Sequence, residues 1–88
     1  MRTVIEAHAV SNVIDAETEI YPRLEDAFEA LKWWLARRPD SGVLLDDENW
    51  IYKQAGDERL NVPSLVVIYT FDHAHVELKF VLVRLPNL

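Results

Sequence analysis

The sequence predicts an α+β fold, in which a small antiparallel or mixed sheet of about four strands packs against one long helix in the first half of the chain. The run from Ser64 to Phe71 is almost continuously apolar and rich in β-branched and aromatic residues, as in a strand covered on both faces. The segment from Val76 to Leu85 first alternates apolar with charged residues and then becomes apolar. Asp72 to His75 can join the two as a tight turn. We therefore expect a β-hairpin at the centre of the sheet.

The long helix is expected between Pro22 and Arg38. Proline suits the first helical position because its missing N–H costs nothing there, and Pro39 cannot continue the helix. Acidic residues in the first turn and arginines in the last complement the helix dipole. Apolar residues recur at helical spacing and predict the buried stripe, which consists of Leu24, Phe28, Leu31 and Leu35.

Residues before this helix allow two interpretations. A strand is expected from about Thr3 to His8, because Val4 and Ile5 favour extended structure. Residues 11–19 then form either a loop or a short helix that is capped by Ser11 or Asn12.

A second hairpin is expected after the helix. Its strands are Val43 to Leu45 and Trp50 to Gln54, and the turn between them, Asp46 to Asn49, is acidic. This turn lacks the spaced oxygen ligands and the glycine of a calcium loop, so we interpret it as a solvated turn. Ala55 to Pro63 forms the longest loop.

Composition limits the class of protein. Half of the 88 residues are hydrophobic, enough for one core and also for a homodimer contact. The chain has no cysteine, which excludes a disulfide framework and fits a reducing compartment. Glu6 comes too early for a signal-peptide core, and no run approaches the roughly 18–20 apolar residues of a membrane span. We therefore expect one cytoplasmic domain over residues 1–88, with no membrane contact.

The charge balance argues against general nucleic-acid binding. Fifteen acidic residues against nine basic ones give a net charge of −6. A generic phosphate binder has the opposite balance, because lysines and arginines that neutralise phosphates supply most of its affinity. A local basic patch remains compatible with this composition.

Trp33 and Trp34 are adjacent on the long helix and cannot face the same way. We expect one indole on the core side and the other on the helix flank. The flanking indole either packs against a neighbouring loop, which we favour, or anchors a protein partner, since exposed tryptophans concentrate interface energy.

The histidines raise a metal hypothesis. His73 and His75 project to one side if the backbone is extended, and His8 can join them if the first strand lies close. Three neutral imidazoles would suit zinc or nickel. The pair lies in a turn, however, where polar residues are ordinary, so we expect no metal and no cofactor.

Four segments, in order and spacing, resemble the RelE/ParE superfamily of bacterial type II toxins. Leu35 to Gly42 is similar to the family's leucine and Pro-x-x-Gly exit from the helix. Trp50 to Lys53 resembles its second hairpin strand, and Val67 to Asp72 its Tyr-x-x-Asp strand. Val76 to Val83 resembles its last strand. The resemblance covers about Leu24 to Arg84 and implies a β-α-β-β-β order.

This resemblance implies a small toxin of a toxin–antitoxin pair, of the kind associated with plasmid stabilisation, that is wrapped by a cognate antitoxin. RNA-cleaving members have a cluster of basic residues and a late tyrosine or histidine. This chain has no arginine in the strand before Tyr69 and no late tyrosine. We therefore expect a toxin-like protein that acts by binding its target, with ribonuclease activity left open. The alternative is a non-enzymatic domain for protein–protein interaction that keeps the fold without a toxic site.

Metal-free RNA cleavage needs a base, an acid and cations around the phosphorus. If Lys53 shares a sheet face with Arg84, the two cations can flank one phosphate. Alternatively, Lys53 is a solvated strand-edge charge and Arg84 pairs with an acid. The candidates for target or RNA binding are Tyr52, Lys53, Arg59 and Arg84.

Overall fold

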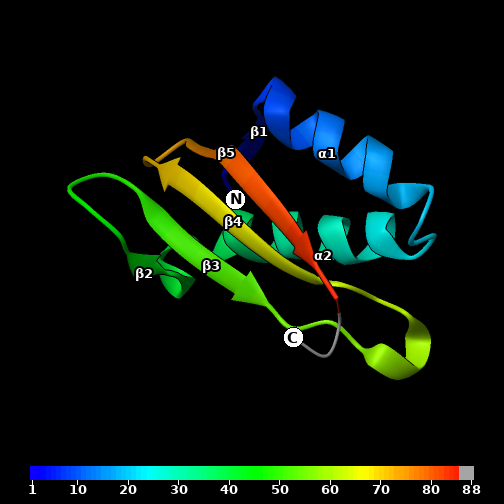
Figure 1. The fold of residues 1–88 in the computed structure, drawn as a ribbon. Coiled ribbons are helices and arrows are strands. Elements are labelled where there is room, and N and C mark those ends of the chain that lie inside the picture. Colours follow the sequence, from blue (N-terminus) through cyan, green and yellow to red (C-terminus); the bar gives the residue numbers. More distant parts are fainter. Residues whose placement is uncertain (86–88) are drawn as a thin grey trace.

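In the computed structural model, which describes residues 1–85, two helices pack on one five-stranded mixed sheet (Figure 1). This confirms the α+β class, with five strands in place of about four. Two short 3-10 turns, η1 (Pro39–Ser41) and η2 (Glu58–Leu60), lie in the connections. The main elements are β1 (Thr3–Glu6), α1 (His8–Thr18), α2 (Leu24–Arg37), β2 (Val43–Leu44), β3 (Trp50–Gln54), β4 (Ser64–Phe71) and β5 (His75–Arg84).

The strands are ordered β1-β5-β4-β3-β2 across the sheet. Strands β2 to β5 form two antiparallel hairpins and pair with each other in sequence, which confirms both predicted hairpins. Strand β1 adds to the other edge and runs parallel to β5, beginning where Thr3 pairs with His75. The two strands can be parallel because the whole chain between them, including both helices, makes the crossover.

The N-terminal boundaries differ from those predicted. Strand β1 ends at Glu6 and not at His8, and residues 11–19 belong largely to α1, with Ala7 at its N-cap. Ser11 and Asn12 therefore lie inside the helix and cap nothing; the Ser11 hydroxyl donates to the Glu6 carboxylate (3.1 Å). The helix forms because Val10 and Ile14, four residues apart, are buried against the sheet.

Helix α2 begins at Leu24, so the prediction that Pro22 occupies its first position is wrong. The N–H of Leu24 donates to the carbonyl of Tyr21 (2.9 Å), and this turn delays the helix by two residues. The predicted apolar stripe is confirmed, since all four of its members are buried. Helix α2 ends at Arg37, just before Pro39, as the sequence predicts.

Both helices lie on the same side of the sheet (Figure 1). Strand β4 shows the result, because Leu65, Val67 and Tyr69 are fully buried beneath the helices while the alternate residues stay partly exposed. The prediction that β4 is covered on both faces is therefore wrong for residues 1–85. We call the uncovered side of the sheet the open face.

Tyr69 ties the covered side of the sheet together. Its buried hydroxyl donates to the carbonyl of Pro39 (2.6 Å) and accepts from the N–H of Gly42 (3.1 Å), so β4 is joined to the segment between α2 and β2. Burial raises the pKa of the Tyr69 phenol. Glycine is required at position 42, because a Cβ there would lie 2.5 Å from both the Tyr69 oxygen and the Ile51 carbonyl oxygen.

Removing this hydroxyl should destabilise the fold. Tyr69→Phe leaves the Pro39 carbonyl and the Gly42 N–H without their partner, which should lower the free energy of unfolding by about 1–3 kcal/mol. Urea denaturation followed by circular dichroism measures the change. Tyr21→Phe is the matched control, because the Tyr21 hydroxyl bonds to no other group among residues 1–85. Equal free energies of unfolding for the two variants would show that the hydrogen bonds of the Tyr69 hydroxyl do not stabilise the fold.

Candidate functional site

The open face is the candidate site, and the side chains in its middle are apolar. Side chains alternate between the two faces of a strand, so the neighbours of the buried residues point away from the helices. Phe80 is 51% exposed and Leu82 is 44% exposed, which is unusual for large apolar residues in the middle of a sheet. The apolar members of the open face are Ile5, Val43, Ile51, Val66, Ile68, Phe80 and Leu82.

One row of paired residues crosses the middle of this face. Ile51 of β3 pairs with Ile68 of β4, which pairs with Phe80 of β5. We call these three residues the central row. A β-bulge lies beside it, because Tyr69 pairs with Leu78 and leaves Lys79 as an extra residue in β5. The Lys79 ammonium group donates to the Asn49 side-chain oxygen (3.0 Å) and so spans β4 on the open face.

Two cations lie at one end of the open face. Lys53 pairs with Val66, which pairs with Leu82, and Arg84 is two residues beyond Leu82 on the same side of β5. Lys53 and Arg84 therefore both lie on the open face. Their Cα atoms are two strands and two residues apart, or roughly 12 Å. Within residues 1–85, no ion pair joins either cation to an acid.

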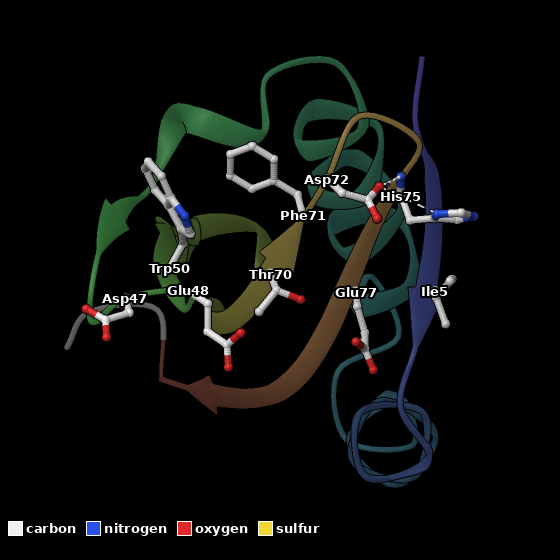
Figure 2. Close-up of a pocket in the computed structure, with 9 residues that line it drawn as sticks. All are labelled: Ile5, Asp47, Glu48, Trp50, Thr70, Phe71, Asp72, His75 and Glu77. Atoms are coloured by element: carbon white, nitrogen blue, oxygen red, sulfur yellow. Dashed lines mark hydrogen bonds and ion pairs between the residues drawn. The ribbon is translucent and has the colours of Figure 1, made fainter.

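The other end of the open face is acidic. A cleft of about 520 Å³ lies there, and Figure 2 shows Glu77, Thr70 and Ile5 side by side on neighbouring strands. Asp47 and Glu48 of the β2–β3 turn complete the polar side. Trp50 and Phe71 border the cleft, with their ring centres 5.3 Å apart. The open face is therefore polarised, with an acidic end, an apolar middle and a basic end.

Asp72 shapes this acidic end through its own turn. Its carboxylate accepts the backbone N–H groups of Ala74 (2.8 Å) and His75 (2.7 Å), as Figure 2 shows for His75. These two bonds lower the pKa of Asp72, because they stabilise the charged carboxylate. The guanidinium of Arg2 donates to the Asp72 carbonyl (2.6 Å) and fixes the turn beside β1.

The four candidates for RNA binding do not form one cluster. Tyr52 and Lys53 both line a pocket of about 360 Å³ beside β2, but the Tyr52 side chain packs toward the core and the Lys53 side chain lies on the open face. Arg59 is on η2, where its side chain is 89% exposed and lies 3.7 Å from Asp57 of the same turn. Neither Arg59 nor Arg84 lines this pocket or the acidic cleft.

The tryptophan prediction needs correction. Trp33 is 55% exposed and Trp34 is 39% exposed, so neither indole lies on the core side of α2. The stripe of α2 that meets the sheet is filled by leucine and phenylalanine. The Arg37 guanidinium lies 3.8 Å from the centre of the Trp33 ring and covers part of it. A role for either indole as a partner anchor stays a prediction.

The three histidines do not come together. His75 lies at the start of β5 beside Thr3, and β1 runs parallel to β5, so His8 is roughly 15 Å further along the sheet. The Nδ1 atom of His75 lies 3.5 Å from Asp72. Residues 1–85 contain no group of three or more side chains placed to hold a metal ion.

We find no match to the chain among protein-family models, curated proteins or solved structures. Neither α1 nor α2, the helices of residues 1–85, has the length and apolar character needed to cross a lipid bilayer. The site is therefore interpreted from its own geometry.

Sequence reasoning missed the open face itself. The signal was present in β4, where Val66 and Ile68 are as apolar as Leu65 and Val67. That pattern indicates two apolar faces but does not say what covers the second. Phe80 gave a weaker signal, because the bulge at Lys79 changes the alternation along β5.

The Asp72 turn should make stability depend on acid pH. A lowered folded-state pKa stabilises the fold above the ordinary value of 3.8, and this stabilisation is lost as the pH falls through the lowered pKa. In Asp72→Asn the amide oxygen can still accept both N–H bonds, but the charge is gone. We expect the wild type to lose more unfolding free energy than Asp72→Asn between about pH 5 and pH 2, measured by urea denaturation at each pH. Asp15→Asn, a substitution on the exposed side of α1, is the control and should lose as much unfolding free energy as the wild type over this pH range. If Asp72→Asn also loses as much as the wild type, the Asp72 carboxylate has an ordinary pKa.

Proposed function

We propose that this chain is a toxin-like protein of a two-gene toxin–antitoxin pair, and that it acts by binding a target through its open face, without catalysis. The observation that carries the proposal is an apolar sheet face that residues 1–85 leave uncovered. Exposed apolar surface favours association when another molecule removes it from water. The central row of Ile51, Ile68 and Phe80 is the part that a target would cover first.

The spacing of the polar groups favours binding over RNA cleavage. Metal-free cleavage requires a base, an acid and cations that converge within hydrogen-bond reach of one phosphate. Lys53 and Arg84 are roughly 12 Å apart at their Cα atoms. Tyr52 points toward the core, and Arg59 lies on a separate turn. These four side chains offer separate contacts on a surface.

The resemblance to the RelE/ParE superfamily supplies the class of partner. The segments that carry it form the exit from α2 and strands β3, β4 and β5, so they build most of the open face and its support. A cognate antitoxin would be the protein that holds the toxin inactive. This part of the proposal rests on the sequence motifs.

Expression of the chain in a bacterium tests the proposal. We expect induced expression to arrest growth, and co-expression of a small neighbouring reading frame, the candidate antitoxin, to relieve the arrest. Phe80→Glu should abolish the arrest, because it places a charge in the centre of the open face. Ile20→Glu is the matched control, since Ile20 is 63% exposed in the turn between α1 and α2. If the wild-type chain is recovered in the supernatant of the lysed cells, and those cells grow without arrest, the proposal is refuted.

The purified chain should leave RNA intact. We expect no cleavage of a mixed-sequence RNA by the wild type, and no difference from the double variant Lys53→Ala and Arg84→Ala, measured by gel electrophoresis of a labelled transcript. Cleavage that the double variant loses would show that the two cations act together in catalysis.

The acidic end of the open face favours a second candidate, an interaction domain with no toxic effect. Glu77, Glu48 and Asp47 would repel phosphates, whereas a protein partner can complement them. The two candidates differ in one result: an interaction domain forms a stable complex with its protein partner and leaves growth unchanged.

A further inference from the structure

We propose that the free chain forms a symmetric homodimer in which the open faces of two copies pack against each other. The two-fold axis runs across the strands, midway between the central row and the next row of paired residues, Lys53, Val66 and Leu82. The inference concerns the chain by itself and does not depend on the target of the proposed function.

The order of residues on β5 fits this axis. A two-fold rotation about a line across the strands reverses the direction along each strand and leaves each strand facing its own copy. Glu77 pairs with Thr70 and Arg84 pairs with Ser64, so the two residues lie on opposite sides of this axis, each about three residue steps from it. The rotation therefore places Glu77 of each copy opposite Arg84 of the other. Such an interface is self-complementary, as a two-fold dimer requires.

The two ends of the face complement each other in charge. The rotation brings the basic end, with Lys53 and Arg84, over the acidic end of the second copy. The carboxylates of Asp47, Glu48, Asp72 and Glu77 line that acidic end. An axis along the strands would instead place acid over acid and base over base. Charge thus selects one of the two ways in which the faces can meet.

The apolar middle supplies the contact. Phe80 and Ile68 of one copy would meet Leu82 and Val66 of the other at the spacing of about 10 Å that is typical of packed sheets. A face four strands wide and as long as the eight residues of β4 covers about 500 Å², or about 1,000 Å² in two copies. This is close to the smallest area of a specific interface, so we expect a dissociation constant in the micromolar range. The strand β4 is then covered on both faces, as its sequence indicates.

The dimer also has a consequence for binding. It buries the surface that the proposed target would use, so dimer and target compete for the central row. At high concentration the chain would be dimeric, with its open face buried. A target or an antitoxin would then have to replace one copy of the dimer in order to bind.

Sedimentation velocity of the full chain over a wide concentration range tests the dimer. We expect a monomer–dimer equilibrium, which Phe80→Glu weakens by about 30-fold or more because it buries a charge at the centre of the interface. Ile20→Glu, matched in chemistry and outside the face, should leave the equilibrium unchanged. A wild type that is monomeric at several hundred micromolar, or a dimer that Phe80→Glu does not weaken, would overturn the proposal.

Charge reversal tests the direction of the axis. R84E and E77R should each weaken the dimer by about tenfold, because each places like charges opposite one another. The double variant with both changes should recover the affinity of the wild type, since the complementary pairs are restored in reversed order. R23E, a charge reversal in the turn before α2, is the control. Additive losses in the double variant would rule out this arrangement.

These results are separate from the growth assay. A monomeric chain that arrests growth would remove the dimer and leave the proposed function standing. If the chain forms a dimer that responds to charge reversal as expected, but its expression leaves growth unchanged, the dimer stands and the proposed function is refuted.

Discussion

The structure depends on an imbalance between the sheet and the helices that cover it. Two helices are enough to bury one face of a five-stranded sheet, and the chain places them on the same face. All the fully buried leucines and valines of the sheet are on that side, together with Tyr69. The second face is apolar in its middle, with Phe80 at its centre. The fold is thus complete in its covered half, while its other half is suited to association.

The covered half does not depend on the open face. Tyr69 bonds to Pro39 and Gly42, and the α2 stripe packs on the sheet, without involving any open-face side chain. Lys32 adds a link between α2 and β1 through Glu6 (2.9 Å). Burial alone would lower the pKa of Lys32, but its hydrogen bonds to Glu29 and Glu6 raise it. Substitutions such as Phe80→Glu can therefore change binding and leave the fold intact, which keeps association and stability separable in experiment.

Local patterns were predicted well because their causes are local. The spacing of Leu24, Phe28, Leu31 and Leu35 predicted the stripe of α2, and both hairpins followed from apolar runs separated by polar turns. Errors arose where packing at a distance decided the outcome. Pro22 could have started the helix, but the turn at Tyr21 delays it. The tryptophans could have reached the core, but the stripe beside them fills it. The spacing between Lys53 and Arg84 required the register of three strands.

The strand from Ser64 to Phe71 shows what each level determined. The sequence by itself determined that this strand has two apolar faces, because hydrophobicity is a property of the residues. Only the tertiary structure decided which face of the strand the helices cover, and that both helices cover the same face. The crossover that makes β1 parallel to β5 brings both helices to the same side of the sheet. Phe80 stays exposed and Val66 and Ile68 stay partly exposed for that reason. In the proposed dimer, a second copy supplies the other cover that the sequence indicates.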